Sequence, residues 1–223
     1  MDKTKIISLS NEYVSVDGSF GGSQMFFKDL PGILNRGRMK GGCGVVALND
    51  TLRYLSGTTA YADKKSYIKS FKKTSRALLY IPTRLGMIFP KLSLGSAFLL
   101  KKYNLPYKCH LVISKRGLYQ KIYSMLSEDI PVIVNVPRIF GKNKKDRSLS
   151  FYDPQSLNVS ARVEGHFVVI TGITSVNDKT YFEISSWGKK YLISCDEYLH
   201  FLKKHPTSLL GCMLNISHRL PLH

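Results

Sequence analysis

The 223-residue sequence predicts an α+β fold in which helices come first and antiparallel strands follow. Apolar residues recur with the helical period of about 3.6 in the first half of the chain, whereas short runs rich in β-branched residues occupy the second half. The two kinds of element are segregated rather than alternating, which favours an α+β arrangement. We see no linker, so we expect one domain over residues 1–223, with a mainly helical half at 1–128 and a mainly β half at 129–223.

The first helix is expected to begin abruptly at Cys43. Residues 1–40 show little periodicity and predict an irregular arm, with a turn-rich stretch at 17–23 and a glycine-rich basic loop at 36–42. An apolar stripe of helical spacing then starts and ends before Gly57. Its members lie at i, i+3, i+7 and i+10: Val45, Leu48, Leu52 and Leu55.

Three further helices are expected in the mainly helical half. The first runs from 63 to 80, with Asp63 as its N-cap, six cationic residues along it and Pro82 as its stop. The second is expected over 93–104 and the third over 115–127, each with apolar residues on one face.

The mainly β half contains the strands. Runs at 131–136 and 166–173 are rich in Val and Ile, and the segment 180–186 follows the second run after a turn at 176–179, so these two segments predict a hairpin. Further strands are expected at 190–193 and 211–216. Between them, Ser194 followed three residues later by Glu197 is a capping-box pattern, which predicts the start of a helix.

The charge of the chain is its most unusual property. Lys and Arg number 33 against 15 Asp and Glu, which gives a formal net charge of +18. A 43% apolar content excludes a largely disordered chain. The charge favours an acidic substrate or partner, and nucleic acid is a weaker possibility because no known nucleic-acid-binding motif is present. The charge run at 142–147 is expected to be an exposed loop.

Composition argues against several other classes of protein. The most apolar stretch, 78–100, is interrupted by prolines and cations, so no run of about 20 apolar residues could span a membrane. The N-terminus lacks the apolar core of a signal peptide, which favours a cytoplasmic location. The four cysteines are scattered without Cys-x-x-Cys spacing, so we expect neither a zinc site nor a disulfide framework, and no cofactor.

The sharpest chemical feature is a cysteine that opens a helix. Cys43 lies between Gly42 and Gly44, where a substrate carbonyl could approach closely. A helix N-terminus carries partial positive charge and free N–H groups, which favour a thiolate and can stabilise an oxyanion. A thiolate needs a proton acceptor, and His166 is the candidate because it follows Gly165 at the start of an apolar strand. Each residue alone could be a packing residue.

The order of the motifs around these two residues resembles that of the papain-like cysteine peptidase superfamily. The segments GCGVVAL (42–48), PVIV (131–134) and GHFVVITG (165–172) occur in the family's order. The later segments SSWG (185–188) and ISCDEY (193–198) are similar to the family's Asn-Ser-Trp-Gly motif and the strand-to-helix segment after it. The resemblance covers roughly residues 35–200 and looks closest to the bacterial branch that contains double-glycine leader peptidases.

The resemblance implies a fold and a set of roles. The nucleophile helix would pack on a C-terminal antiparallel sheet, Cys43 would attack a peptide carbonyl, and His166 would be the general acid and base. The family's orienting Asn or Asp falls on Ser185, with Ser186 as the neighbouring alternative on the opposite strand face. Trp187 would shield the histidine.

The oxyanion glutamine of the family has no match six residues before Cys43. We expect the nearest amide, Asn35, to replace it beside the Cys43 backbone N–H, and Gln24 is a more remote alternative.

These departures leave two functions open: a cysteine peptidase acting on a peptide or protein, or a catalytically degenerate papain-like module that binds an acidic protein or nucleic acid. Deamidation and transpeptidation use closely related thioester chemistry.

Overall fold

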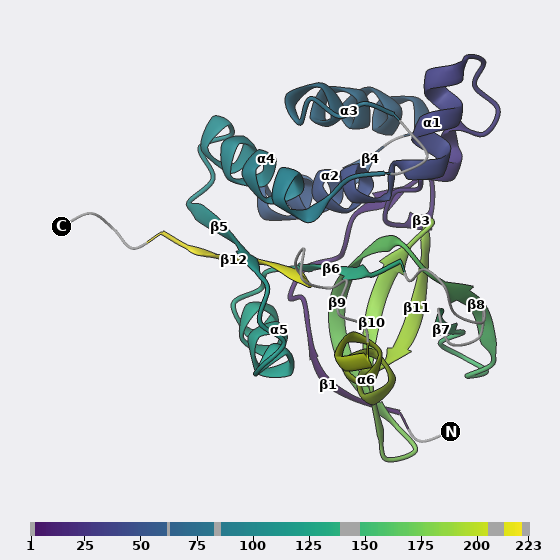
Figure 1. Ribbon diagram of the computed structural model, residues 1–223, viewed down its shortest axis with the longest axis vertical. Coiled ribbons are helices and arrows are strands. Elements are labelled where there is room, and N and C mark those ends of the chain that lie inside the picture. Colours follow the sequence, from purple (N-terminus) through teal and green to yellow (C-terminus); the bar gives the residue numbers. More distant parts are fainter. Residues whose placement is uncertain (1–2, 62, 83–85, 139–147, 205–211, 220–223) are drawn as a thin grey trace.

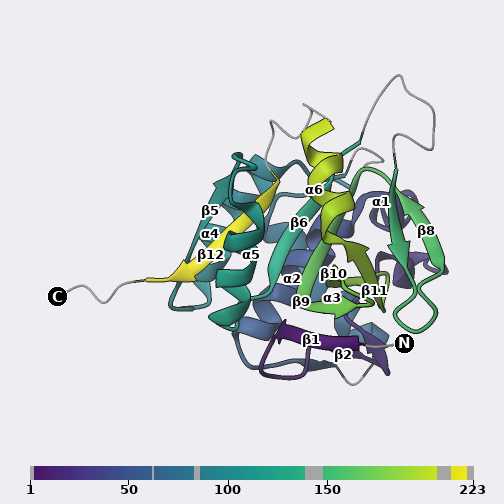
Figure 2. The ribbon, with the colours of Figure 1, turned by 90° about the horizontal axis from the view of Figure 1, so that it is seen from below.

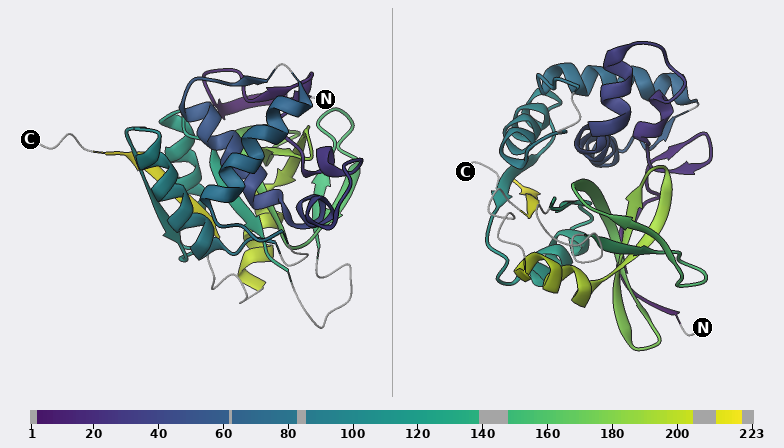
Figure 3. Two further views of the ribbon diagram at one scale, coloured as in Figure 1. Left: turned by 90° about the horizontal axis from the view of Figure 1, so that it is seen from above. Right: turned by 45° about the vertical axis from the view of Figure 1, so that its right-hand side comes forward.

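A computed structural model describes residues 3–61, 63–82, 86–138, 148–204 and 212–219. It has mixed α and β content and is dominated by one large antiparallel sheet with helices on both faces (Figure 1). Helices α2, α3 and α4 lie on one side, and α5 and α6 lie on the other, which Figure 2 shows from below and Figure 3 from two further directions.

Nine strands of the described residues form this sheet, in the order β5-β12-β6-β9-β10-β11-β7-β8, with β1 paired to β9. Every pairing within it is antiparallel. The strands are β1 (Lys3–Ser8), β5 (Tyr107–Val112), β6 (Val132–Val136), β7 (Leu149–Tyr152), β8 (Val159–Val163), β9 (His166–Val176), β10 (Lys179–Ser186), β11 (Lys189–Ser194) and β12 (Met213–His218).

A three-stranded sheet and the helices complete the described fold. The small sheet consists of β2 (Ser15–Val16), β3 (Ser19–Phe20) and β4 (Ala60–Tyr61). The helices are η1 (Gln24–Phe27), α1 (Ile33–Gly41), α2 (Cys43–Leu55), α3 (Lys64–Ala77), α4 (Phe89–Lys102), α5 (Leu118–Ser127) and α6 (Cys195–Lys204). Helix α2 packs against β9, β6, α3 and α4, so it lies between the sheet and the outer helices.

Several local predictions are confirmed. Helix α2 begins at Cys43, and Asp63 caps α3 by accepting a 2.6 Å hydrogen bond from the Ser66 N–H. The β9–β10 hairpin turns at Asn177 and Asp178, which both have positive φ angles, as a two-residue turn requires. The helix after Ser194 is also present, although the Glu197 side chain accepts from the Tyr152 hydroxyl at 2.6 Å instead of closing a capping box.

The expected irregular arm is wrong. Residues 3–8 form β1, and residues 33–41 form α1 where a basic loop was expected at 36–42. The sequence gives α1 no buried apolar stripe, because Ile33 is 76% exposed and Leu34 is 54% exposed.

Strands β5, β7 and β8 were not predicted either. Since β1 and β5 come from residues 1–128, the large sheet takes strands from both halves of the chain. The charge run at 142–147 and Gly211 lie outside the described residues, and no helix within the described ranges is long and apolar enough to cross a membrane.

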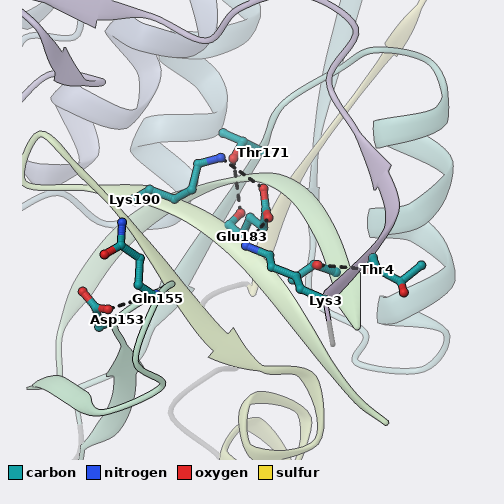
Figure 4. Close-up of polar contacts among 8 residues, drawn as sticks. Lys3, Thr4, Asp153, Gln155, Thr171, Glu183 and Lys190 are labelled. Carbon is teal, nitrogen blue, oxygen red and sulfur yellow. Dashed lines mark hydrogen bonds and ion pairs between the residues drawn. The ribbon is translucent and has the colours of Figure 1, made fainter. Parts of the chain in front are cut away.

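A buried carboxylate ties the edge strand β1 to the centre of the sheet. Glu183 on β10 is 7% exposed and forms ion pairs with Lys3 of β1 at 3.4 Å and Lys190 of β11 at 3.3 Å (Figure 4). The Thr171 hydroxyl of β9 donates to the Glu183 backbone carbonyl at 3.4 Å. This cluster therefore links four strands and holds β9, the strand that carries His166.

Candidate active site

The junction of α1 and α2 places Cys43. Helix α1 ends at Gly41, Gly42 makes the turn, and α2 begins at the next residue. A Cβ at position 42 would lie 2.4 Å from the Arg38 carbonyl oxygen, so only glycine fits there. The two helices can therefore follow one another without a loop, and the thiol lies at the first residue of α2, where it is 7% exposed.

Burial disfavours ionisation of the Cys43 thiol. Burial raises the pKa of the thiol, and hydrogen bonds from the backbone of Phe167, Gly44 and Cys43 itself oppose that rise, as does the positive charge of Arg138. These backbone groups lower the pKa, so they are N–H groups that favour negative charge at the sulfur. They are also the kind of donor that an oxyanion needs.

His166 is buried and neutral. It is the first residue of β9, and its Nε2 lies 2.8 Å from the Ser186 hydroxyl oxygen on β10. Its ring stacks on Trp187 with centroids 4.6 Å apart and an interplanar angle of 25°. Burial lowers the pKa of His166 to about 3, so the imidazole is uncharged at neutral pH.

Trp187 is held over His166 by an unusual turn. Ser186 pairs with Lys189, so Trp187 and Gly188 form a two-residue hairpin loop, and both have positive φ angles, 51° and 76°. A side chain in this left-handed region costs roughly 1–2 kcal/mol. The expected role of Trp187 as a cover for the histidine agrees with this position.

Cys43 and His166 line one small cavity. Gln24, Asp50 and Trp187 are among the other residues around it. The cavity measures about 10 Å³, which is room for roughly one water-sized molecule.

Among the described residues, no hydrogen bond joins the Cys43 thiol to the His166 ring. Phe167 lies against α2, since a Cβ on Gly44 would lie 3.3 Å from its ring, whereas the His166 ring contacts Ser186 and Trp187.

The structure assigns the orienting contact to Ser186, not to Ser185. Ser185 pairs with Val169, so Ser186 falls on the strand face that His166 and Val168 share. The Ser185 hydroxyl donates instead to the Phe20 carbonyl at 3.1 Å. The expectation that Ser185 orients the imidazole is therefore corrected, whereas Ser186 lies, as expected, on the strand face opposite to that of Ser185.

The amide beside Cys43 is that of Gln24, not that of Asn35. Asn35 lies on α1, where its Nδ2 donates to the Pro31 carbonyl at 2.7 Å and its Oδ1 accepts from Arg38 at 2.7 Å. Gln24 is 8% exposed and lines the cavity. The intervening α1 helix is the reason, because it carries the chain away from the site between Gln24 and Cys43.

Sequence reasoning missed Asp50, which lies seven residues after Cys43 on α2. Its carboxylate accepts from the Gly22 N–H at 2.7 Å and from the Tyr67 hydroxyl at 2.8 Å, and burial raises its pKa to about 7. Asp50 thereby holds the segment that leads to Gln24. An acidic residue in an otherwise apolar helix face was the signal available in the sequence.

The other three cysteines, Cys109, Cys195 and Cys212, are buried and free. Burial raises the pKa of all three thiols. Within the described ranges, no three His, Cys, Asp or Glu side chains come together as a metal site would require.

The comparisons with known proteins do not assign this chain to a family. No family model matches the chain, and no curated protein matches it. Among solved structures, digestive procathepsin L 3 from the larval midgut of Tenebrio molitor aligns with 97% of this chain and 70% of its own, at 13% identity and a TM-score of 0.29. We base no conclusion on a likeness this low.

Proposed function

We propose that the chain is a papain-like thiol hydrolase, a cysteine peptidase that acts on a peptide or protein through a thioester at Cys43. The observation that carries the proposal is the shared cavity, which a helix-opening cysteine, a neutral histidine and a buried glutamine line together. The motif resemblance of the sequence supports the same assignment.

The proposed reaction starts from a thiol and a neutral imidazole. The Cys43 sulfur bonds to the acyl carbon while its proton passes to His166. The oxyanion is stabilised by the Cys43 backbone N–H and the Gln24 amide. The carbon–nitrogen bond then breaks, His166 returns the proton to the leaving amine, and a water molecule hydrolyses the thioester with His166 again taking the proton.

Ser186 acts in this scheme as a positioning residue. Its hydroxyl lies 2.8 Å from Nε2, so it accepts from Nε2–H in the tautomer that leaves Nδ1 as the basic nitrogen. A serine is neutral, and it stabilises an imidazolium less than a carboxylate does. This difference predicts a slow enzyme.

Substrate binding must widen the cavity before the chemistry can begin. The cavity holds about one water-sized molecule, and the thiol and ring are not hydrogen bonded among the described residues. Catalytic hydrogen bonds are often long without substrate and tighten on binding, so this geometry is compatible with the reaction.

The contacts of His166 in this structure are also compatible with a second candidate function. If His166 remains on Ser186 and Trp187 when a partner binds, Cys43 stays a neutral thiol and the fold acts as a papain-like binding module for an acidic partner. The two functions differ in one measurable property, which is acylation of Cys43.

The test is a burst assay that needs no knowledge of the natural substrate. The full chain is mixed with a p-nitrophenyl ester, and released nitrophenol and the site of acylation are measured by absorbance and peptide mass mapping. We expect one equivalent of nitrophenol and an acyl group on Cys43. Cys43→Ala removes both, whereas Cys109→Ala, a matched loss of another buried cysteine, retains them.

Two further variants test the mechanism. His166→Ala is expected to slow acylation by about 10²–10⁴-fold, and Gln24→Ala by about 10²–10³-fold. Labelling that is equally fast on all four cysteines, or that does not respond to His166→Ala, would contradict the hydrolase. The binding module predicts no burst in the unaltered chain.

A further inference from the structure

A basic groove lies at the opposite end of α2 from Cys43. Arg53 in the last turn of α2 forms one wall, α3 forms the other, and β4 closes one end. Helix α3 is on the outside of the helical layer (Figure 1). The groove measures about 540 Å³. Ten residues of helix separate Cys43 from Arg53, about 15 Å at the helical rise, so the groove is distinct from the candidate active site.

Four cations line this groove and none of its lining residues is acidic. Lys69, Lys73 and Arg76 lie on one face of α3, opposite Arg53. Like charges at i, i+4 destabilise a helix, so this unbalanced cluster does not stabilise α3. The acid at the start of α3, Asp63, is engaged in the helix cap, where it accepts from the Ser66 N–H at 2.6 Å.

The floor of the groove is polar and connected. The Tyr61 hydroxyl donates to Ser70 Oγ at 2.9 Å, and Ser70 Oγ donates to Asn49 Oδ1 at 2.9 Å. Asn49 is 2% exposed and also accepts from the Thr74 hydroxyl at 3.0 Å. A second cavity of about 160 Å³ continues from the groove along Arg53, Ser70 and Lys73, and no acidic residue lines it either.

Arg53 is fixed in place with an unused donor. Its guanidinium carbon lies 4.5 Å from the centroid of the Tyr61 ring, a cation–π contact. Its Nε is buried and has no hydrogen-bond partner among the described residues. An aromatic ring thus holds the Arg53 guanidinium beside the groove, where its charge can act on an anion.

We propose that this groove binds a compact anion carrying two or more phosphate groups. Four cations that line one groove match a multiply charged ligand, since Arg and Lys are the side chains that recognise phosphate. The volume lies within the range of small-molecule sites, about 300–1,000 Å³. The ligand is either a free polyphosphate compound or the phosphorylated headgroup of a lipid, which present the same chemistry to the groove.

The experiment measures binding of inorganic tripolyphosphate to the full chain by calorimetry. The groove variant is Lys69→Gln with Lys73→Gln. The matched control is Lys65→Gln with Lys72→Gln, which removes the same charge from the same helix at residues that do not line the groove. The melting temperature of each variant checks that it is folded.

We expect the groove variant to weaken binding by about tenfold or more, because it removes charge-assisted hydrogen bonds, and the control to change it by less than about threefold. A parallel arm measures cosedimentation with phosphatidylcholine vesicles that contain phosphatidylinositol bisphosphate. Binding of tripolyphosphate identifies a free ligand, and binding of vesicles alone identifies a headgroup, provided that the groove variant abolishes it.

Equal weakening in the groove variant and the control would overturn the proposal, because it would reduce the effect to the general basic charge of α3. Absence of binding in both arms would overturn it as well. Neither result bears on Cys43, since the burst assay is independent of these lysines.

Discussion

The positive φ angle of Trp187 connects backbone strain to the state of His166. The residue occupies the left-handed region at φ 51°, where Asn is favoured and a tryptophan is strained. Stacking on the His166 ring compensates for this strain and excludes water from the imidazole. The hairpin turn therefore contributes, through Trp187, to the burial that lowers the pKa of His166.

Replacing Trp187 should raise the pKa of His166. In Trp187→Asn the turn is kept but the stacked ring is lost, so we expect the pKa of His166 to rise from about 3 toward its ordinary value of about 6.5. The titration is followed by NMR of the imidazole. Trp187→Phe keeps a ring and should give an intermediate value. An unchanged titration in the Asn variant would show that burial by other residues sets the pKa.

The segment before η1 depends on Gly22, because the backbone at this residue lies very close to the Tyr67 side chain. A Cβ at this position would lie 1.9 Å from the Tyr67 hydroxyl oxygen, which itself donates to Asp50. The Gly22 N–H also donates to Asp50, so the glycine and the carboxylate fix the backbone two residues before Gln24. The position of the candidate oxyanion donor is thus a property of this segment and not of Gln24 alone.

Gly22→Ala should therefore destabilise the chain more than a comparable change elsewhere in the same arm. We expect a loss of about 1–3 kcal/mol from overpacking, measured by guanidinium unfolding. Gly18→Ala is the control, because its Cβ would meet no atom within 4 Å and only its φ of 77° is unfavourable. Equal losses in the two variants would contradict the assigned contact with Tyr67.

Elements with a buried apolar stripe could be predicted from the sequence, and elements without one could not. Helix α2 buries Val45, Leu48 and Leu52 against the sheet, so its spacing alone gave its start and extent. Helix α1 exposes its apolar residues, and β1 is mostly exposed along Lys3–Ser8, so neither leaves a periodic pattern.

The same limit applies to the candidate site. Cys43 and His166 stood out because each begins a strongly apolar element. The choice of Ser186 over Ser185 depends on the pairing register of β10 with β9, and the choice of Gln24 over Asn35 depends on the unpredicted α1. Both are long-range properties of the fold that local spacing does not contain.

At the scale of the whole molecule, His166 and Asp50 should have opposite effects on how the free energy of unfolding changes with pH. The pKa of His166 is lowered to about 3 from an ordinary value of about 6.5, so its contribution is present above pH 6.5 and is lost as the pH falls toward 3. The pKa of Asp50 is raised from 3.8 to about 7, so its contribution is present below pH 3.8 and is lost as the pH rises through 7.

Single variants should separate the two contributions. Asp50→Asn removes the Asp50 contribution, which grows as the pH falls from 7 toward 3.8, so the free energy of unfolding of this variant, relative to the unaltered chain, should decrease as the pH falls from 6.5 to 4. In His166→Gln the same difference should increase as the pH falls from 7 to 4. Guanidinium unfolding at several pH values gives both differences, and other carboxylates cancel because they are common to all three chains. Parallel pH profiles for the two variants would mean that neither group titrates at its assigned pKa.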